Sequence, residues 1–311
     1  MKMPFDIPYF DAHCDTLTCT GGSPLRENSG HLDLERLRAY RTAGQFFAVF
    51  ADSAKQRPEE YFPTCRRFYE RFCAEMEKNA DAVMQCRTGE DIETAFRQHK
   101  VAAILSIEGS EHIDCAVEKL ETAAQWGIRA INITWNHANL NSGSNIEEPE
   151  RGLSANGRAF VREAEKHRIL MDVSHLSEPG FWDLMEISER PVIASHSDAK
   201  ALCPHPRNLT DAQIRALVDK RGFIGLNYYT EFVGGKKDLD ALIAHAEHML
   251  SLGAEDVLGL GADWDGCDNL AAGLSGVQDM PLLYEALYRR NYSETLLHKI
   301  FSGNLVRVLS V

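Results

Sequence analysis

The sequence predicts an α/β protein, a distorted (β/α)₈ TIM barrel formed by a single domain over residues 1–311. Two observations indicate this fold: eight short apolar, β-branched runs recur along the chain, and amphipathic helical patterns lie between them. A third observation excludes the main alternative. An open doubly wound sheet usually carries a glycine-rich phosphate loop, and the chain contains neither GxGxxG nor GxxxxGK[ST].

The predicted strands are spaced so that a helix fits between most neighbours. Each strand is a short apolar run that ends in turn-forming or polar residues, as expected for buried parallel strands. In chain order the eight are Tyr9–His13, Gln45–Ala51, Val101–Ile107, Ile128–Thr134, Ile169–Ser174, Pro191–His196, Phe223–Tyr228 and Val257–Asp263.

Helical patterns occupy the connections between these strands. From Tyr61 to Met76 the apolar residues repeat at spacings of 4, 3, 4 and 4, which describes one helix face. The long connection from Asp52 to Lys100 is expected to hold two helices and to cover the barrel mouth. Further helices are predicted over Cys115–Trp126, Ser154–His167, Asp211–Lys220 and Asp238–Leu252. The expected N-caps and stops are Ser154, Thr210, Asp211, Gly222 and Gly253.

Charge and composition exclude several classes of partner. The chain has 33 Lys plus Arg against 46 Asp plus Glu, a net charge of -13, which argues against nucleic acid and anionic membranes. Its longest apolar runs, such as Phe46–Ala51, are too short to span a bilayer. The first six residues lack the apolar region of a signal peptide, and the eight cysteines are scattered singly. We therefore expect a cytoplasmic protein with reduced thiols.

Five predicted strands end in residues that bind metal ions. His13 and Asp15 are two positions apart, so in an extended chain their side chains point the same way. Because the carboxyl ends of barrel strands meet at one mouth, ligand-type residues there are expected to lie together. The other residues of this kind are Glu108, His175, His196 and Asp263. The sequence thus predicts a metal site at the barrel mouth.

The ligand set exceeds the needs of one tetrahedral zinc ion. Two ions sharing a carboxylate would use it better, with His13 and Asp15 on one ion, His175 and His196 on the other, and Glu108 between them. No lysine lies at these strand ends, so the bridge is expected to be glutamate. Two such ions can share a hydroxide and lower its pKa to make a nucleophile at neutral pH.

Eight short segments surround the predicted strand ends and follow one another along the chain. They are DAHCD at 11–15, SIEG at 106–109, NITWNH at 132–137, LMDVSHLS at 170–177, PVIASHS at 191–197, PRN at 206–208, GADWDG at 261–266 and GNLVRV at 303–308. In this order, the segments resemble the membrane dipeptidase (renal dipeptidase) family of metallopeptidases, in a bacterial-type form. The resemblance runs from about residue 9 to the end of the chain and is weak over Asp52–Lys100 and Leu140–Arg151, two regions expected to shape specificity.

The resemblance implies a binuclear zinc hydrolase that acts on dipeptides. It assigns His13, Asp15 and Glu108 to one ion and Glu108, His175 and His196 to the other, with Mn²⁺ or Co²⁺ as alternatives to the two Zn²⁺ ions. Members of the family tolerate D-residues at the C-terminal position, and some hydrolyse β-lactams or acylated amino acids. Family members are often homodimers, which implies the same assembly here.

Three residues match family positions with a catalytic or substrate-binding role. His137 matches a histidine near the scissile carbonyl and is expected to donate to the oxyanion; the alternative is an exposed loop histidine. Arg207 carries a guanidinium suited to bidentate capture of a terminal carboxylate. Asp263 is expected to move a proton from the bridging water to the leaving amine, together with the catalytic carboxylate Glu108. For Asp263 the alternative is orientation of a metal ligand.

Asn227 and Tyr228 end the seventh predicted strand and could line the substrate pocket, with Tyr228 touching the substrate carboxylate; the alternative is that they only close the barrel. The favoured function is a cytoplasmic metallodipeptidase, L-D dipeptides included. The alternative within enzymes is a binuclear amidohydrolase acting on N-acyl amino acids or lactams. A non-catalytic barrel that binds metal or peptide, and a purely structural metal site, are the alternatives from other classes.

Overall fold

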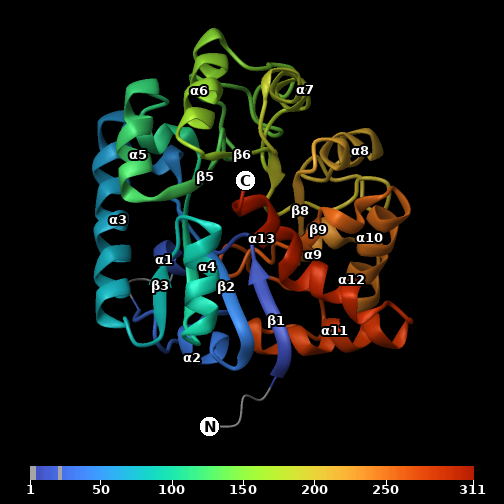
Figure 1. Cartoon of the computed structure of the whole chain (residues 1–311). Helices are drawn as coiled ribbons and strands as arrows, with labels where there is room; N and C mark the ends of the chain where they lie inside the picture. Colours follow the sequence, from blue (N-terminus) through green and yellow to red (C-terminus); the bar gives the residue numbers. More distant parts are fainter. Residues whose placement is uncertain (1–4, 20–22) are drawn as a thin grey trace.

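The computed structural model describes residues 5–19 and 23–311, so Met1 to Pro4, at the start of the segment expected to lack a leader, lie outside it. Eight parallel strands close into a ring because β2 pairs with β1 on one side and with β4 on the other. The predicted barrel is confirmed (Figure 1). Its strands are β1 Phe5–Asp11, β2 Tyr40–Val49, β4 Val101–Glu108, β5 Ile128–Asn132, β6 Leu170–Asp172, β7 Ile193–Ala194, β8 Phe223–Leu226 and β9 Leu258–Leu260.

A ninth strand, β3 (Val83–Gln85), was missed by the sequence analysis. It pairs with β4 at residues 101–103, on the edge that β5 occupies farther along at residues 105–108. β3 therefore lies outside the ring. A three-residue strand whose second and third side chains are half-buried has too little apolar pattern to be recognised.

The helices surround the barrel, as Figure 1 shows, and several begin where the sequence predicts. Ser154 caps α6 by accepting from Gly157 N, and Thr210 forms a capping box with Gln213 at the start of α8. Asp211 is the first residue of α8 rather than its cap. The longer helices are α3 Tyr61–Lys78, α4 Gly89–Arg97, α5 Leu120–Trp126, α6 Ala155–Lys166, α7 Glu178–Ile187, α8 Asp211–Asp219, α10 Leu239–Ser251 and α11 Met280–Arg289. The shorter ones are α1 Thr16–Cys19, α2 Leu34–Leu37, α9 Thr230–Val233, α12 Glu294–His298 and α13 Asn304–Leu309.

The helix predicted over Cys115–Trp126 is shorter in the structure, because a 3₁₀ turn at Val117–Lys119 precedes α5. The long connection from Asp52 to Lys100 holds the two predicted helices, α3 and α4, with β3 between them. Within residues 5–19 and 23–311, no helix has both the length and the apolar character required to cross a membrane. All eight cysteines are free.

The C-terminal helix closes one end of the barrel. Leu305, Val308 and Leu309 of α13 pack in one cluster with inward side chains of the strands, including Phe10 and Phe223. Arg307 adds hydrogen bonds to the carbonyls of Arg221, Gly222 and Asp256, which immediately precede β8 and β9. This is the amino end of the strands, so the carboxyl end is left for the functional site.

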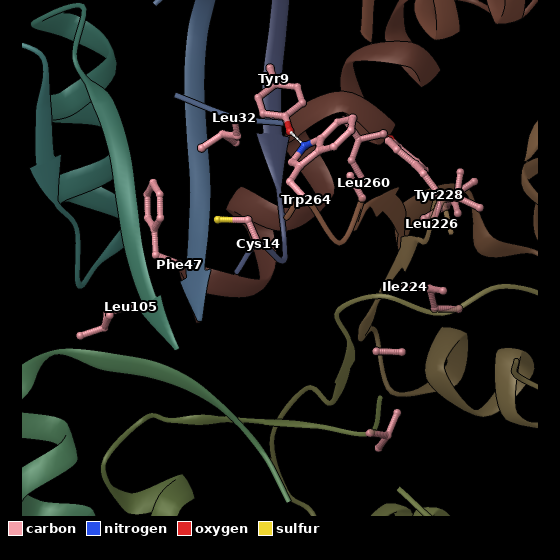
Figure 2. Close-up of a cluster of buried hydrophobic side chains, with 14 of the residues drawn as sticks. Tyr9, Cys14, Leu32, Phe47, Leu105, Ile224, Leu226, Tyr228, Leu260 and Trp264 are labelled. Atoms are coloured by element: carbon pink, nitrogen blue, oxygen red, sulfur yellow. Dashed lines mark hydrogen bonds between the residues drawn. The ribbon is translucent and has the colours of Figure 1, made fainter. Parts of the chain in front are cut away.

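A second apolar cluster packs the strands against the surrounding elements. Figure 2 shows its centre near β1, where Trp264 Nε1 donates to the hydroxyl of Tyr9 at 2.8 Å. The ring of Tyr228 meets the indole of Trp264 edge-on at a centroid distance of 5.4 Å. The buried side chain of Trp264 therefore anchors the segment just after β9, which also carries Asp263.

Candidate active site

The side chains predicted from the strand ends converge at the carboxyl end of the barrel. His13 Nε2 lies 3.4 Å from Asp15 Oδ2, 3.6 Å from Glu108 Oε2 and 3.8 Å from Asp263 Oδ1. Two sets of potential ligand atoms lie within 4.8 Å of one another: His13, Glu108 and His196, and His13, Asp15 and Asp263. Within the described part of the chain, His13 Nε2 and Asp15 Oδ1 are buried without a hydrogen-bond partner. Such a set of buried donor atoms fits a bound cation.

His175 and His196 form the second half of the cluster. Their Nε2 atoms lie 3.0 Å apart and face Glu108 Oε1 at 3.0 and 3.5 Å. The Nδ1 of His175 contacts Asn136 Oδ1 at 2.9 Å, so that nitrogen carries the proton and Nε2 presents a lone pair. The His196 Nδ1 contacts Ser195 Oγ at 2.7 Å. Burial lowers the pKa of both imidazoles well below the ordinary value, which keeps them in the neutral form that metals require.

Carboxylates dominate the electrostatics around His13. Burial raises the pKa of Glu108 well above its usual value, and burial also raises the pKa of Asp263. Burial disfavours the charged ring of His13, but Glu108, Asp15 and Asp263 outweigh it and raise the pKa of His13 to about 10. The cluster thus attracts positive charge strongly, and a divalent cation among these groups would displace the proton of His13.

The backbone bends where the ligands leave the strands. His175 and Asp263 have φ values of 73° and 62°, in the left-handed region that non-glycine residues seldom adopt. Both residues follow a strand end by three positions, and the turn directs each side chain over the mouth. These two strained positions coincide with two of the side chains that converge at the barrel mouth, and backbone strain of this kind clusters at functional sites.

Two buried aspartates hold these bends, and the sequence analysis gave neither of them a role. Asp172 Oδ1 accepts from Ser174 N and from Ser195 N, each at 3.0 Å. Asp11 accepts from His13 N at 3.0 Å and from Ala262 N at 2.9 Å. A sequence signal for this role does exist. An aspartate at the start of a turn commonly accepts a hydrogen bond from the backbone N–H two residues later.

Arg207 lies beside the cluster as the sequence analysis expects. It is 4% exposed, its Nη2 donates to His196 O at 3.4 Å, and its Nε and Nη1 have no partner in the described residues. Burial lowers its pKa to about 10, and the guanidinium remains charged at neutral pH. Arg207 lines a cavity of about 200 Å³ together with Asp15, Glu108, His175 and Asp263. An unpaired buried guanidinium at this position suits a substrate carboxylate.

His137 is not brought into the cluster. Its ring faces Glu147 Oε2 at 3.3 Å and Asp52 Oδ1 at 3.7 Å, and its side chain is 38% exposed. Its neighbours Trp135 and Asn136 line the cavity instead. The chain turns after β5. Because of this turn, Trp135 and Asn136 face the cavity and His137 does not.

Tyr228 lies elsewhere than expected, for a similar reason. Its side chain is fully buried on Trp264, whereas the next residue, Tyr229, lines the cavity. The predicted strand Phe223–Tyr228 is too long at its end. β8 stops at Leu226, so the side chains of residues 227 and 228 no longer alternate as they would in a strand. Asn227 is also fully buried, and its Nδ2 donates to Asp263 Oδ2 at 3.2 Å. Asn227 therefore contacts Asp263 and is not among the residues that line the cavity.

A closed parallel barrel whose mouth holds buried histidines, aspartate and glutamate defines the class of metal-dependent hydrolases. The family model described as membrane dipeptidase, peptidase family M19, matches residues 3–311, so the chain belongs to this family and is a metallodipeptidase. The predicted family and activity are thereby confirmed.

Curated relatives and solved structures agree with this family. An uncharacterized protein in the pqqA 5′ region of Klebsiella pneumoniae is 33% identical over 243 residues, which cover 74% of this chain and 89% of that protein. The dipeptidase tcpJ of Claviceps purpurea is 29% identical over 298 residues, covering 92% of this chain and 70% of that protein. A metallopeptidase from Rhodobacter sphaeroides, solved with a phosphinate mimic of L-Ala-D-Ala, superposes with a TM-score of 0.90 at 26% identity, covering 98% of this chain and 99% of that chain. Dipeptidase AC, a family M19 metallopeptidase, superposes with a TM-score of 0.89 at 27% identity and the same coverage.

Proposed function

We propose that this chain hydrolyses small dipeptides, L-D dipeptides included, with two divalent ions, which we expect to be zinc. The observation that carries the proposal is that the two carboxylate oxygens of Glu108 face different histidines. Its Oε2 faces His13, whereas its Oε1 faces His175 and His196. One carboxylate between two ligand groups supports a pair of ions bridged by Glu108, with His13 and Asp15 on one side and the two other histidines on the opposite side.

When bound, such ions would polarise the scissile carbonyl and lower the pKa of a water molecule. The residues of the chain divide the remaining work. Arg207 binds the terminal carboxylate, and the cavity of about 200 Å³ favours a short substrate. Asp263, oriented by Asn227, accepts a proton from the attacking water and passes it to the leaving nitrogen. We assign no step to His137, because Glu147 and Asp52 hold it away from the cluster.

The test is hydrolysis of a panel of L-L and L-D dipeptides, with N-acyl amino acids and a lactam in the same panel. The stereochemistry of the phosphinate mimic bound to the Rhodobacter relative makes L-Ala-D-Ala the first substrate to try. We expect activity that is lost on chelation, returns with zinc and is absent from His175→Ala. Turnover of acyl amino acids or the lactam without any dipeptide turnover would overturn the substrate class and leave the metal centre standing.

Metal content decides the number of ions separately from activity. We expect wild-type protein to hold about two zinc ions per chain and His175→Ala to hold about one, because that variant keeps His13 and Asp15. Manganese and cobalt are tested by reconstitution of the chelated protein. A single ion in the fully active protein would contradict the bridging role of Glu108.

We propose further that the protein works in the cytoplasm as a homodimer. Eight free cysteines suit a reducing compartment, and the dimer follows from the resemblance to the family. Fractionation of native cells tests the location, and light scattering of the purified protein tests the assembly. A monomer at all concentrations would exclude the dimer.

A further inference from the structure

The amino end of the barrel, opposite the metal centre, carries three arginines at the starts of three neighbouring strands. Arg129 is the second residue of β5, Arg168 lies two residues before β6, and Arg190 lies three residues before β7. The pairings of Ala130 with Leu170 and of Asp172 with Ile193, continued backwards, place Arg129 and Arg190 at one level on either side of β6. At about 4.8 Å between strands, their backbones are about 10 Å apart, within joint reach of two arginine side chains.

Arg129 is the unusual member of this group. The register between β4 and β5 shifts at this point, because Leu105 pairs with Ile128 and Ser106 pairs with Ala130. Arg129 is thus the extra residue of a bulge, a feature that redirects a side chain. The residue is only 8% exposed, and its Nε is buried without a partner. Within residues 5–19 and 23–311, its guanidinium takes part in no hydrogen bond or ion pair.

The two neighbouring arginines are also short of acceptors. Arg190 Nη2 donates to Val311 O at 2.5 Å, and its Nε is buried without a partner in the described residues. Figure 1 shows the C-terminus beside β5 and β6, in agreement with this contact. Arg168 is exposed, and its guanidinium has no ion pair in the described part of the chain. Three guanidinium groups therefore leave most of their donors unused.

Among the residues that the structure describes, no carboxylate forms an ion pair with Arg129. Glu165, near the end of α6, already accepts from the hydroxyl of Ser188 and from the backbone N–H groups of Glu189 and Arg190. Burial, followed by repulsion from Arg190 and Arg168, lowers the pKa of Arg129 to about 10. A buried, unpaired charge costs folding energy unless a counterion satisfies it. In a chain with a net charge of -13, the local excess of positive charge is conspicuous.

We propose that Arg129, Arg168 and Arg190 form a binding site for a phosphate-type dianion at the amino end of the barrel. Guanidinium forks match phosphate oxygens in bidentate geometry, and a phosphate offers more acceptors and more charge than a single carboxylate. The anion is either free phosphate or the phosphate group of a small metabolite. The site is separate from the catalytic mouth, because the strands of the closed barrel and the apolar side chains packed inside it lie between the two ends.

Calorimetric titration of the metal-loaded protein with inorganic phosphate tests the site. We expect Arg168→Gln and Arg129→Gln each to weaken binding by about tenfold or more, as loss of a charge-assisted contact requires. Arg162→Gln, which removes an exposed arginine of α6, is the matched control and should bind as wild type does. Because Arg168 is exposed, its variant remains informative if Arg129→Gln does not fold. Unchanged affinity in both test variants would overturn the proposal.

Three further arms place and identify the ligand. Loss of phosphate binding in Arg207→Ala would assign the anion to the catalytic mouth and overturn the site. Tighter binding of glycerol phosphate than of inorganic phosphate would identify a phosphorylated metabolite as the source, and the reverse order would identify free phosphate. Equal binding of succinate would overturn the phosphate class. In phosphate-free buffer Arg129→Gln should melt no lower than wild type, and added phosphate should raise the melting temperature of wild type and of Arg162→Gln more than that of Arg129→Gln.

Discussion

At the residue scale, the buried side chain of Arg207 is the group that we propose selects the substrate. Its guanidinium is held by His196 O and Phe232, with two nitrogens left unpaired beside the metal cluster. The unmet donors point to a ligand with an anionic end. A free C-terminal carboxylate supplies such an end in every dipeptide, whatever its side chains.

Arg207→Ala should raise KM by about tenfold or more and change kcat less, since the lost contact is made in both the ground state and the transition state. Arg207→Lys should recover only part of the loss, because an ammonium cannot bind a carboxylate with two parallel hydrogen bonds. Steady-state kinetics on one dipeptide measure both effects. An unchanged KM in the alanine variant would remove Arg207 from substrate binding.

His112 should make the folded state sensitive to acid. Burial lowers the pKa of His112 from 6.5 to about 4, and its Nε2 accepts from Ala51 N at 3.3 Å. Since the unfolded chain binds this proton more readily, the contribution of His112 to stability is complete above pH 6.5 and is lost as pH falls towards 4. The loss approaches about 1.4 kcal/mol per pH unit within that window.

His112→Gln should flatten this part of the pH profile, because glutamine can accept the same hydrogen bond without titrating. Urea unfolding at a series of pH values measures the slope, and the exposed His99→Gln serves as control. Equal slopes in wild type and His112→Gln would show that His112 is not the group responsible.

At the scale of elements, β6 and β7 are too short for their own pairing to fix the distance between them. They have three and two residues and share one register pair, Asp172 with Ile193. Each strand is followed by a proposed metal ligand, His175 or His196, so an interaction other than the β-ladder hydrogen bonds must fix their spacing. The carboxylate of Asp172 does this by accepting from one backbone N–H on each side, and Ser174 Oγ adds a bond from His196 N at 3.1 Å.

Asp172→Ala should therefore loosen the pair His175 and His196 and weaken metal binding on that side, while the His13 side retains its ion. Loss of an acceptor for two buried N–H groups should also cost about 1–3 kcal/mol of stability. Metal analysis after dialysis and thermal melting measure the two effects. Asp172→Asn keeps one acceptor oxygen and should restore much of the metal content. If Asp172→Ala lost metal equally from the His13 side and from the His175 and His196 side, Asp172 would not be the residue that fixes the second side.

On the scale of the whole molecule, the barrel concentrates negative charge at one end and closes the other end with α13. Asp15, Glu108 and Asp263 surround His13 within 4 Å, in a chain that already carries a net charge of -13. Cations at the mouth would relieve this repulsion and couple the strand ends to one another. Metal binding and folding should therefore be linked.

Removal of metal by chelation should lower the melting temperature, and zinc should restore it, because a ligand that binds only the folded state stabilises it by mass action. Thermal melting with a chelator and then with added zinc measures the shift. His175→Ala should show a smaller shift, because it retains one of the two proposed ligand groups. No shift in wild type would mean that the cluster does not hold the ions.

Much of the fold and of the candidate site follows from local pattern. Apolar runs that stop abruptly at His, Asp or Glu mark both the strands and the mouth. The positions of His137, Tyr228 and Asn227 could not be predicted from local pattern. If a turn begins one residue earlier or later, a different side chain faces the cavity. β3 escaped notice because three residues carry too little pattern.

The sequence by itself determined the barrel and the family. It also singled out the six residues of the proposed metal and proton-transfer cluster, since each lies at or just after the end of an apolar run and the ends of parallel strands must converge. Only the tertiary structure decided the positions of the other residues. Trp135, Asn136 and Tyr229 line the cavity, and Asp11 and Asp172 bind the backbone of the turns that follow the strands. The arginines lie at the opposite end of the barrel. These roles depend on which way a side chain leaves a turn or a bulge and on what remains unpaired after the chain has folded. Both depend on contacts between distant segments, which no local pattern records.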